Sequence, residues 1–75
     1  MEAGWRAHIV STPEVLRGKP RIKSTRIPVS LVLGHLAMGK SPDEIIGEYP
    51  DLRKDQIAAC MEYARDLAEF EVEVA

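Results

Sequence analysis

With 75 residues and a hydrophobic content of 45%, the chain should form one domain with a generous share of apolar side chains. A chain this short buries only about 60% of its unfolded surface, so we expect a homodimer to cover part of the surplus. The formal net charge of −2 argues against a generic nucleic-acid binder. One cysteine excludes an internal disulfide, and without a signal peptide or a membrane-spanning run we expect a soluble, cytoplasmic protein.

The charges are divided unevenly along the chain. Residues 1–30 carry six basic and two acidic side chains, a balance of +4, and residues 31–75 carry four basic and ten acidic side chains, a balance of −6. This division indicates that the two halves meet different partners, or meet each other across a dimer. Chance is the alternative in so short a chain.

The N-terminal part of the chain is predicted to be an arm. Residues 1–8 read as a flexible leader, in which Trp5 either pins the arm to the body or is exposed. Residues 9–28 read as a basic arm with extended pieces at Ile9-Val10 and Arg21-Ile22. Strands this short are unstable alone, so they should pair with each other, and the same arm of a second subunit is a possible further partner.

The first predicted helix begins after Pro28 and ends at Gly39. Between them, apolar side chains fall on one helical face, at Val29, Val32, Leu33, Leu36 and Ala37. Gly39 is placed to end the helix as a C-cap glycine. Gly34 costs roughly 1 kcal/mol against alanine inside a helix, which predicts that another backbone packs closely there.

Two further helices are predicted between residues 41 and 68. Ser41 and Glu44 form a capping box, with a proline at the first helical position between them. Pro50 ends that helix, and the last helix begins near Arg53 or Lys54. So short a connection makes the two helices cross steeply, as in a helix-turn-helix. The predicted helix-turn-helix core spans residues 29–68. Residues 69–75 form an acidic tail. In this tail, apolar and acidic side chains alternate, which favours a strand or an extended segment over a fraying helix end.

Four sequence blocks in order resemble domain-of-unknown-function family 433, over about residues 9–64. The blocks are Gly18-Lys19-Pro20-Arg21-Ile22, Thr25-Arg26-Ile27-Pro28-Val29, Gly39-x-Ser41-x-x-Glu44-Ile45 and Tyr49-Pro50-Asp51-Leu52. The resemblance implies an all-α, homeodomain-like three-helix core with a short N-terminal β arm, usually dimeric. It also implies an antitoxin-like role beside a PIN-like ribonuclease toxin.

Two positions depart from the pattern of that family. Ser24 stands where the family usually has glycine, so this serine is strained if the turn requires a positive φ. Arg53 stands where serine or threonine caps the last helix, which weakens the helix start by roughly 1 kcal/mol.

A DNA-binding interpretation rests on the start of the last helix. Arg53, Lys54 and Gln56 lie where a recognition helix meets bases and phosphates. Arg21 and Lys23 on the arm would add contacts to the DNA backbone. Acidic residues on the same helix count against this interpretation, because a DNA reader usually presents a basic footprint.

A protein-binding interpretation rests on the arm and the tail. A basic residue suits the clustered carboxylates of a ribonuclease active site, so Thr25 and Arg26 on an exposed turn are candidates for toxin binding. The tail residues Phe70, Val72 and Val74 would dock as an added strand or in a groove. The structural alternative is that Thr25 bonds the turn backbone and Arg26 pairs with an acid of the body.

Catalysis is not expected. His8, His35 and Cys60 are not spaced as metal ligands on one helix face, and no phosphate loop or nucleophile elbow is present. We therefore expect no enzyme activity, no metal and no cofactor. The sequence favours an antitoxin-like helix-turn-helix protein that neutralises a PIN-like ribonuclease and regulates its operon on operator DNA. A stand-alone DNA-binding regulator and a dimerisation module are the alternatives.

Overall fold

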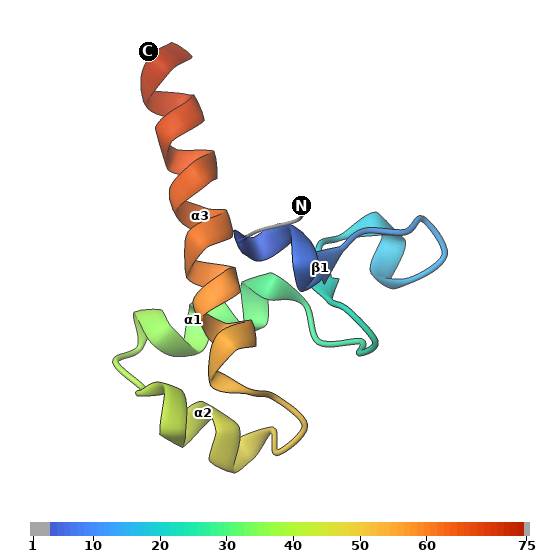
Figure 1. The fold of residues 1–75 in the computed structure, drawn as a ribbon, viewed down its shortest axis with the longest axis vertical. Coiled ribbons are helices and arrows are strands. Elements are labelled where there is room, and N and C mark those ends of the chain that lie inside the picture. The colour runs from blue at the N-terminus through green and yellow to red at the C-terminus, as the bar shows by residue number, and fades with distance from the viewer. Residues whose placement is uncertain (1–3, 75) are drawn as a thin grey trace.

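The computed structural model describes the backbone of residues 4–74 and the side chains of residues 4–69, and most of this chain is helical (Figure 1). Its helices are α1 (Val29–Ala37), α2 (Pro42–Glu48) and α3 (Lys54–Val74), preceded by two short 3-10 turns, η1 (Gly4–Ala7) and η2 (Leu16–Gly18). The two strands are β1 (Ile9–Val10) and β2 (Arg21–Ile22). Three helices with a small sheet agree with the predicted helical core and short β arm.

The two strands pair with each other inside one chain. β1 and β2 are antiparallel, with Ile9 opposite Ile22 and Val10 opposite Arg21. Ile9 and Ile22 are buried, at 6% and 0% exposure, so the hairpin is held against the helices by its own apolar side chains. The rest of the arm projects to one side of the helices (Figure 1).

The expected helix ends are present in α1 and α2. Gly39 has a φ of 92° and its N–H donates to the Leu36 carbonyl at 2.9 Å, as expected for a glycine that ends a helix. Ser41 and Glu44 form the full capping box, with N···O distances of 2.8 and 3.1 Å. The prediction from Gly34 is wrong: nothing lies within 4 Å of the position its Cβ would occupy.

The core lies where the hairpin and the three helices meet. Its largest fully buried side chains come from every one of these elements: Ile22, Val32, Ile45, Ile57 and Cys60. α3 contributes two of them and contacts both α1 and α2. Burying each large aliphatic side chain contributes about 1.5–3 kcal/mol, so the first half of α3 holds the fold together.

The predicted strand or extended tail after residue 68 is wrong. α3 continues through Val74, so residues 69–74 are helical. The physical reason is that a helix satisfies its backbone N–H and C=O groups internally, whereas an added strand needs a neighbouring edge. In the described residues the sheet pairs β1 only with β2, so it offers the tail no paired edge, and residues 69–74 continue the helix.

The N-terminal segment packs against α3 from Gly4 onward. Residues 4–7 form η1, and η1 contacts α3, so the prediction of a flexible leader is wrong for these residues. Trp5 meets Tyr63 edge to face, with ring centroids 4.8 Å apart. Of the two readings of Trp5, the structure shows the one in which it pins the arm to the body.

Candidate functional site

The turn that follows β2 is a rigid support for the basic arm. The Thr25 hydroxyl donates to the Ile22 carbonyl at 2.7 Å and accepts from the Ile27 N–H at 3.0 Å. Ser24 has a φ of 68°, the left-handed conformation that favours glycine. Thr25 therefore bonds the turn backbone, as the structural alternative for this toxin-binding candidate stated.

Arg21 ties two loops of the arm together. Its Nη1 donates to the Thr25 carbonyl at 3.0 Å, and its Nη2 donates to the Thr12 hydroxyl at 3.2 Å. Its Nε is buried and finds no hydrogen-bond acceptor among the described residues. The guanidinium is half-buried and occupied by these contacts, so the phosphate contact expected of Arg21 would have to replace them.

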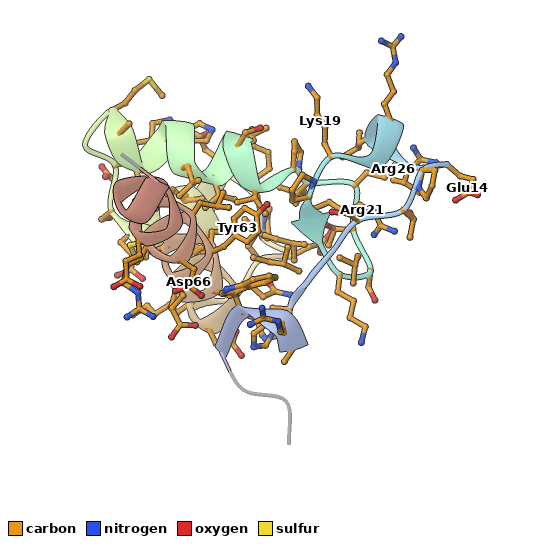
Figure 2. All side chains as sticks on the ribbon, turned by 90° about the horizontal axis from the view of Figure 1, so that it is seen from above. Glu14, Lys19, Arg21, Arg26, Tyr63 and Asp66 are labelled. Carbon is orange, nitrogen blue, oxygen red and sulfur yellow. The ribbon has the colours of Figure 1, made fainter. Side chains whose placement is uncertain are left out.

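The remaining cations of the arm have no carboxylate partner among the side chains of residues 4–69. In residues 4–69, every ion pair within 4.0 Å takes its acid from α2 or α3. None of these pairs involves the exposed cations of the arm, which are Arg17, Lys19, Lys23 and Arg26. Lys19 extends away from the body in Figure 2, where Arg21 and Arg26 lie on the projecting arm. Arg17, Lys19, Lys23 and Arg26 together are the arm cations.

Arg26 lies beside a shallow hollow on the arm. The hollow has a volume of about 380 Å³ and is lined by Val15, Arg21, Ser24, Thr25 and Arg26. Two guanidinium groups on a fixed turn favour an oxyanion such as a carboxylate or phosphate. The structural alternative for Arg26, pairing with an acid of the body, is not what the structure shows, because no carboxylate of the described residues lies within 4.0 Å.

Arg17 and Lys19 were missed by the sequence analysis as candidate contacts. Leu16 and Arg17 both have positive φ, at 53° and 56°, and Gly18 follows at 82°. A bulky residue rarely adopts this conformation, and such strain clusters at functional positions. Gly18 indicated a tight turn in the sequence, but residue type gave no signal that Leu16 and Arg17 before it also have positive φ.

The start of α3 is poorly suited to reading DNA bases. Gln56 is 7% exposed, and its Oε1 accepts a hydrogen bond from the Arg53 N–H at 2.8 Å. Arg53 pairs with Asp55 at 3.1 Å, and Lys54 pairs with Asp43 at 3.3 Å. Of the predicted DNA contacts on this helix, Gln56 is part of the core and the two cations are exposed beside acids. Lys23 is exposed on the arm, where its backbone N–H donates to the His8 carbonyl at 2.8 Å.

The third set of predicted contacts cannot be placed. The side chains of Phe70, Val72 and Val74 lie outside the described residues, although the backbone there is helical. The structure therefore brings Arg21, Thr25 and Arg26 together on the arm, and it separates them from Arg53 and Lys54 at the start of α3.

The described residues include no group of three or more metal-binding side chains. Cys60 is buried, which raises the pKa of its thiol to about 11, so this thiol is protonated at neutral pH. No helix within the described part of the chain is both long and apolar enough to cross a lipid bilayer.

The fold and the arm define a class of small, mostly helical domains with a two-stranded basic arm. The sequence model of the DUF433 family, described as a protein of unknown function, matches residues 9–64. The chain belongs to the DUF433 family, which confirms the resemblance found in its sequence.

Two relatives are similar to the chain over most of its length. An uncharacterized protein of Sinorhizobium fredii, y4eO, is 32% identical over 62 residues, which are 83% of this chain and 28% of that protein. The crystal structure of a DUF433 member from Anabaena variabilis superposes with a TM-score of 0.75 and 33% identity, covering 81% of this chain and 60% of that one. The chain thus spans less than two thirds of either relative.

Proposed function

We propose that this protein is the antitoxin-like partner of a PIN-like ribonuclease and that it occupies the acidic active site of that enzyme with its basic arm. The observation that carries the proposal is that, within residues 4–69, no carboxylate lies within 4.0 Å of the arm cations, while four acidic side chains of the body, Asp43, Glu48, Asp55 and Asp66, are engaged in ion pairs. Clustered carboxylates that bind metal ions are chemically matched by guanidinium groups.

Arg26 is the side chain we propose as the central contact. It is exposed, it has no ion pair among the described residues, and the turn that carries it is held by Thr25 and Arg21. A rigid turn loses little conformational freedom when it binds, so more of the interaction energy appears as affinity. Arg21 would contribute its fixed positive charge from the floor of the same hollow.

DNA binding is the second part of the proposal and has less support. A homeodomain-like helix-turn-helix would use α2 and α3, which are joined through the turn at Pro50 and Asp51. Autoregulation of an operon would then depend on Arg53 and Lys54, each of which would have to leave an acidic neighbour. Gln56 is not proposed as a base contact, because it is buried and bonded to the backbone.

The test is inhibition of RNA cleavage by a PIN-like ribonuclease encoded beside this gene. Arg26→Ala should weaken inhibition by about 30-fold or more, as expected when one partner of an interfacial charge pair is removed. Its melting temperature should stay nearly unchanged, because Arg26 makes no ion pair in the described residues. Lys54→Ala removes one exposed cation from the body and is the matched control, with inhibition unchanged.

Three results would contradict the proposal in different ways. Equal inhibition by Arg26→Ala and the unmodified protein removes Arg26 as the contact, and unfolding of the variant makes Arg26 structural. Failure of the unmodified protein to bind the ribonuclease removes the antitoxin role. Retention on operator DNA that falls with salt by a slope of about −0.9 per phosphate contact would then support the stand-alone regulator.

A further inference from the structure

An apolar groove lies between the start of α1 and the middle of α3. It has a volume of about 320 Å³ and is lined mainly by Pro20, Val29, Leu33, Tyr63 and Leu67. Tyr63 lies between α1 and α3 in Figure 2. Leu67 is 49% exposed, so the groove opens to solvent along α3. Open apolar surfaces rimmed by polar residues are where protein segments and other ligands dock.

A second hollow continues this groove toward the arm. It has a volume of about 310 Å³ and is lined by Leu16, Arg17, Lys19, Pro28 and Ser30. Lys19 and Ser30 line both hollows, so the two are adjoining sections of one groove, an apolar section and a cationic section. Neither section shares a lining residue with the hollow beside Arg26.

Contacts with the body hold the walls of the groove in place. Tyr63 meets Trp5 edge to face with ring centroids 4.8 Å apart, and Trp5 donates to Asp66 of the same helix at 2.8 Å. On the opposite side, the Pro20 carbonyl accepts from the Val29 N–H at 3.0 Å, which ties the arm to the start of α1. A groove that is already formed loses little conformational freedom when a partner binds.

The charge of the groove is one-sided. Arg17 and Lys19 are exposed, and no carboxylate lies within 4.0 Å of either side chain in residues 4–69. None of the residues that line the two sections is acidic. A carboxylate at this end of the groove would therefore meet positive charge alone and would displace no internal ion pair.

We propose that the groove docks a segment of a protein partner in which large apolar side chains adjoin a carboxylate. The apolar side chains cover Leu33, Tyr63 and Leu67, and the carboxylate pairs with Lys19 and Arg17. In the complex proposed above, this segment belongs to the ribonuclease, an assignment that rests on the proposed function. The groove then adds affinity, whereas the arm at Arg26 blocks the active site.

Titration of the ribonuclease measures affinity and inhibition separately. Leu67→Glu should raise the dissociation constant by about tenfold or more, because it places a charge in an apolar contact. Saturating amounts of this variant should still inhibit fully, since Arg26 is intact. Met61→Glu is the matched control, because it introduces the same charge at a residue of α3 that is 45% exposed and outside the groove. It should bind like the unmodified protein.

The cationic section is tested with a pair of substitutions at one exposed position. Lys19→Glu should raise the dissociation constant by about tenfold or more, because it opposes the partner's carboxylate. Lys19→Arg keeps the positive charge and should bind like the unmodified protein. Circular dichroism checks that all variants are folded. Since Lys19 is exposed, this pair decides the question even where Leu67→Glu disturbs the fold.

A small fluorescent probe tests the groove without the ribonuclease. Anilinonaphthalene sulfonate joins apolar rings to an anion, which is the chemistry proposed for the occupant. Its fluorescence should rise saturably with the unmodified protein, and Leu67→Glu and Lys19→Glu should each weaken its binding by about tenfold. Arg26→Ala and Met61→Glu should leave probe binding unchanged, because neither residue lines the groove.

The results separate this proposal from the proposed function. A ribonuclease that binds both Leu67→Glu and Lys19→Glu as tightly as the unmodified protein overturns the groove contact, while weaker inhibition by Arg26→Ala leaves the antitoxin role standing. Where the unmodified protein binds no ribonuclease, the antitoxin role fails and the probe decides: binding that depends on Lys19 and Leu67 supports the groove as a docking site, and equal binding by all variants overturns it. Self-association that sedimentation equilibrium shows to be abolished by Leu67→Glu would assign the groove to a second copy and also overturn the proposal.

Discussion

The indole Nε1 of Trp5 donates a hydrogen bond to Oδ2 of Asp66 at 2.8 Å, across 61 positions of sequence. This bond, with Arg65 beside it, holds the pKa of the Asp66 carboxyl below its ordinary value. Trp5 is the one tryptophan of the chain. The contact between η1 and α3 can therefore be followed by its fluorescence.

The first prediction concerns acidification. A lowered pKa in the folded state means that Asp66 stabilises the contact fully above the ordinary aspartate pKa of about 3.9. That stabilisation is lost as the pH falls through the lower, folded pKa. We expect a change in Trp5 fluorescence below about pH 3.9. Asp66→Asn keeps an acceptor for the indole but cannot titrate, so a transition of equal size in this variant would contradict the assignment.

The second prediction concerns the turn after β2. Ser24→Gly should raise the free energy of unfolding by about 1 kcal/mol, because glycine adopts the observed φ of 68° without a steric penalty. Urea denaturation measures the change. Ser30→Gly is the control with the opposite sign, since Ser30 is an exposed residue in α1 and glycine weakens a helix. Equal effects at both positions would show that the turn is not strained.

The third prediction concerns the start of α3. The Gln56 side chain already accepts from the Arg53 N–H, but arginine has no acceptor to return to the Gln56 N–H. Arg53→Thr completes this capping box and should raise the free energy of unfolding by about 0.5–1 kcal/mol. The gain should persist when Gln56→Ala is also present, because the threonine hydroxyl accepts from the backbone N–H of residue 56, which alanine retains. DNA affinity that is indifferent to Arg53→Thr would remove Arg53 as a DNA contact.

The fourth prediction concerns the glycine inside α1. Open space surrounds the Cβ position of Gly34, so Gly34→Ala should stabilise the protein by roughly 1 kcal/mol through helix propensity alone. Gly39→Ala is the control: its Cβ position is also open, but its φ of 92° makes the substitution unfavourable. Thermal unfolding of both variants measures the two signs. Loss of stability in Gly34→Ala would mean that this site is covered in solution.

The elements predicted correctly from sequence are those set by neighbouring residues. The Ser41–Glu44 capping box and the glycine that ends α1 depend on residues close along the chain. The pairing of β1 with β2 was predictable because strands this short need a partner, and each is the nearest strand to the other in the sequence. Hydrogen bonds within a few residues can be read from residue type and spacing. The error at residues 69–74 arose because a period-two pattern of apolar and acidic residues does not exclude a helix.

The candidate site was predictable only in part. The distribution of charge in the sequence showed that the arm is basic and made Arg21, Lys23 and Arg26 candidates. The residue type of Thr25 suggested that its hydroxyl bonds the turn backbone instead of a partner. Which of these side chains is free depended on distances between loops: Arg21 reaches Thr12, whereas Arg26 reaches no acid in residues 4–69. The burial of Gln56 was not predictable from its local sequence, because it follows from the packing of α3 on the body.

By itself, the sequence determined the family, the ends of α1 and the start of α2, and the basic character of the arm, since each of these follows from local residue type and order. Only the tertiary structure decided that Trp5 meets Asp66, that Gln56 is buried and that the arm cations stand apart from the acids of the body. The reason is that burial and charge pairing depend on which segments come together in space, and residues distant in sequence carry no local signal of that meeting.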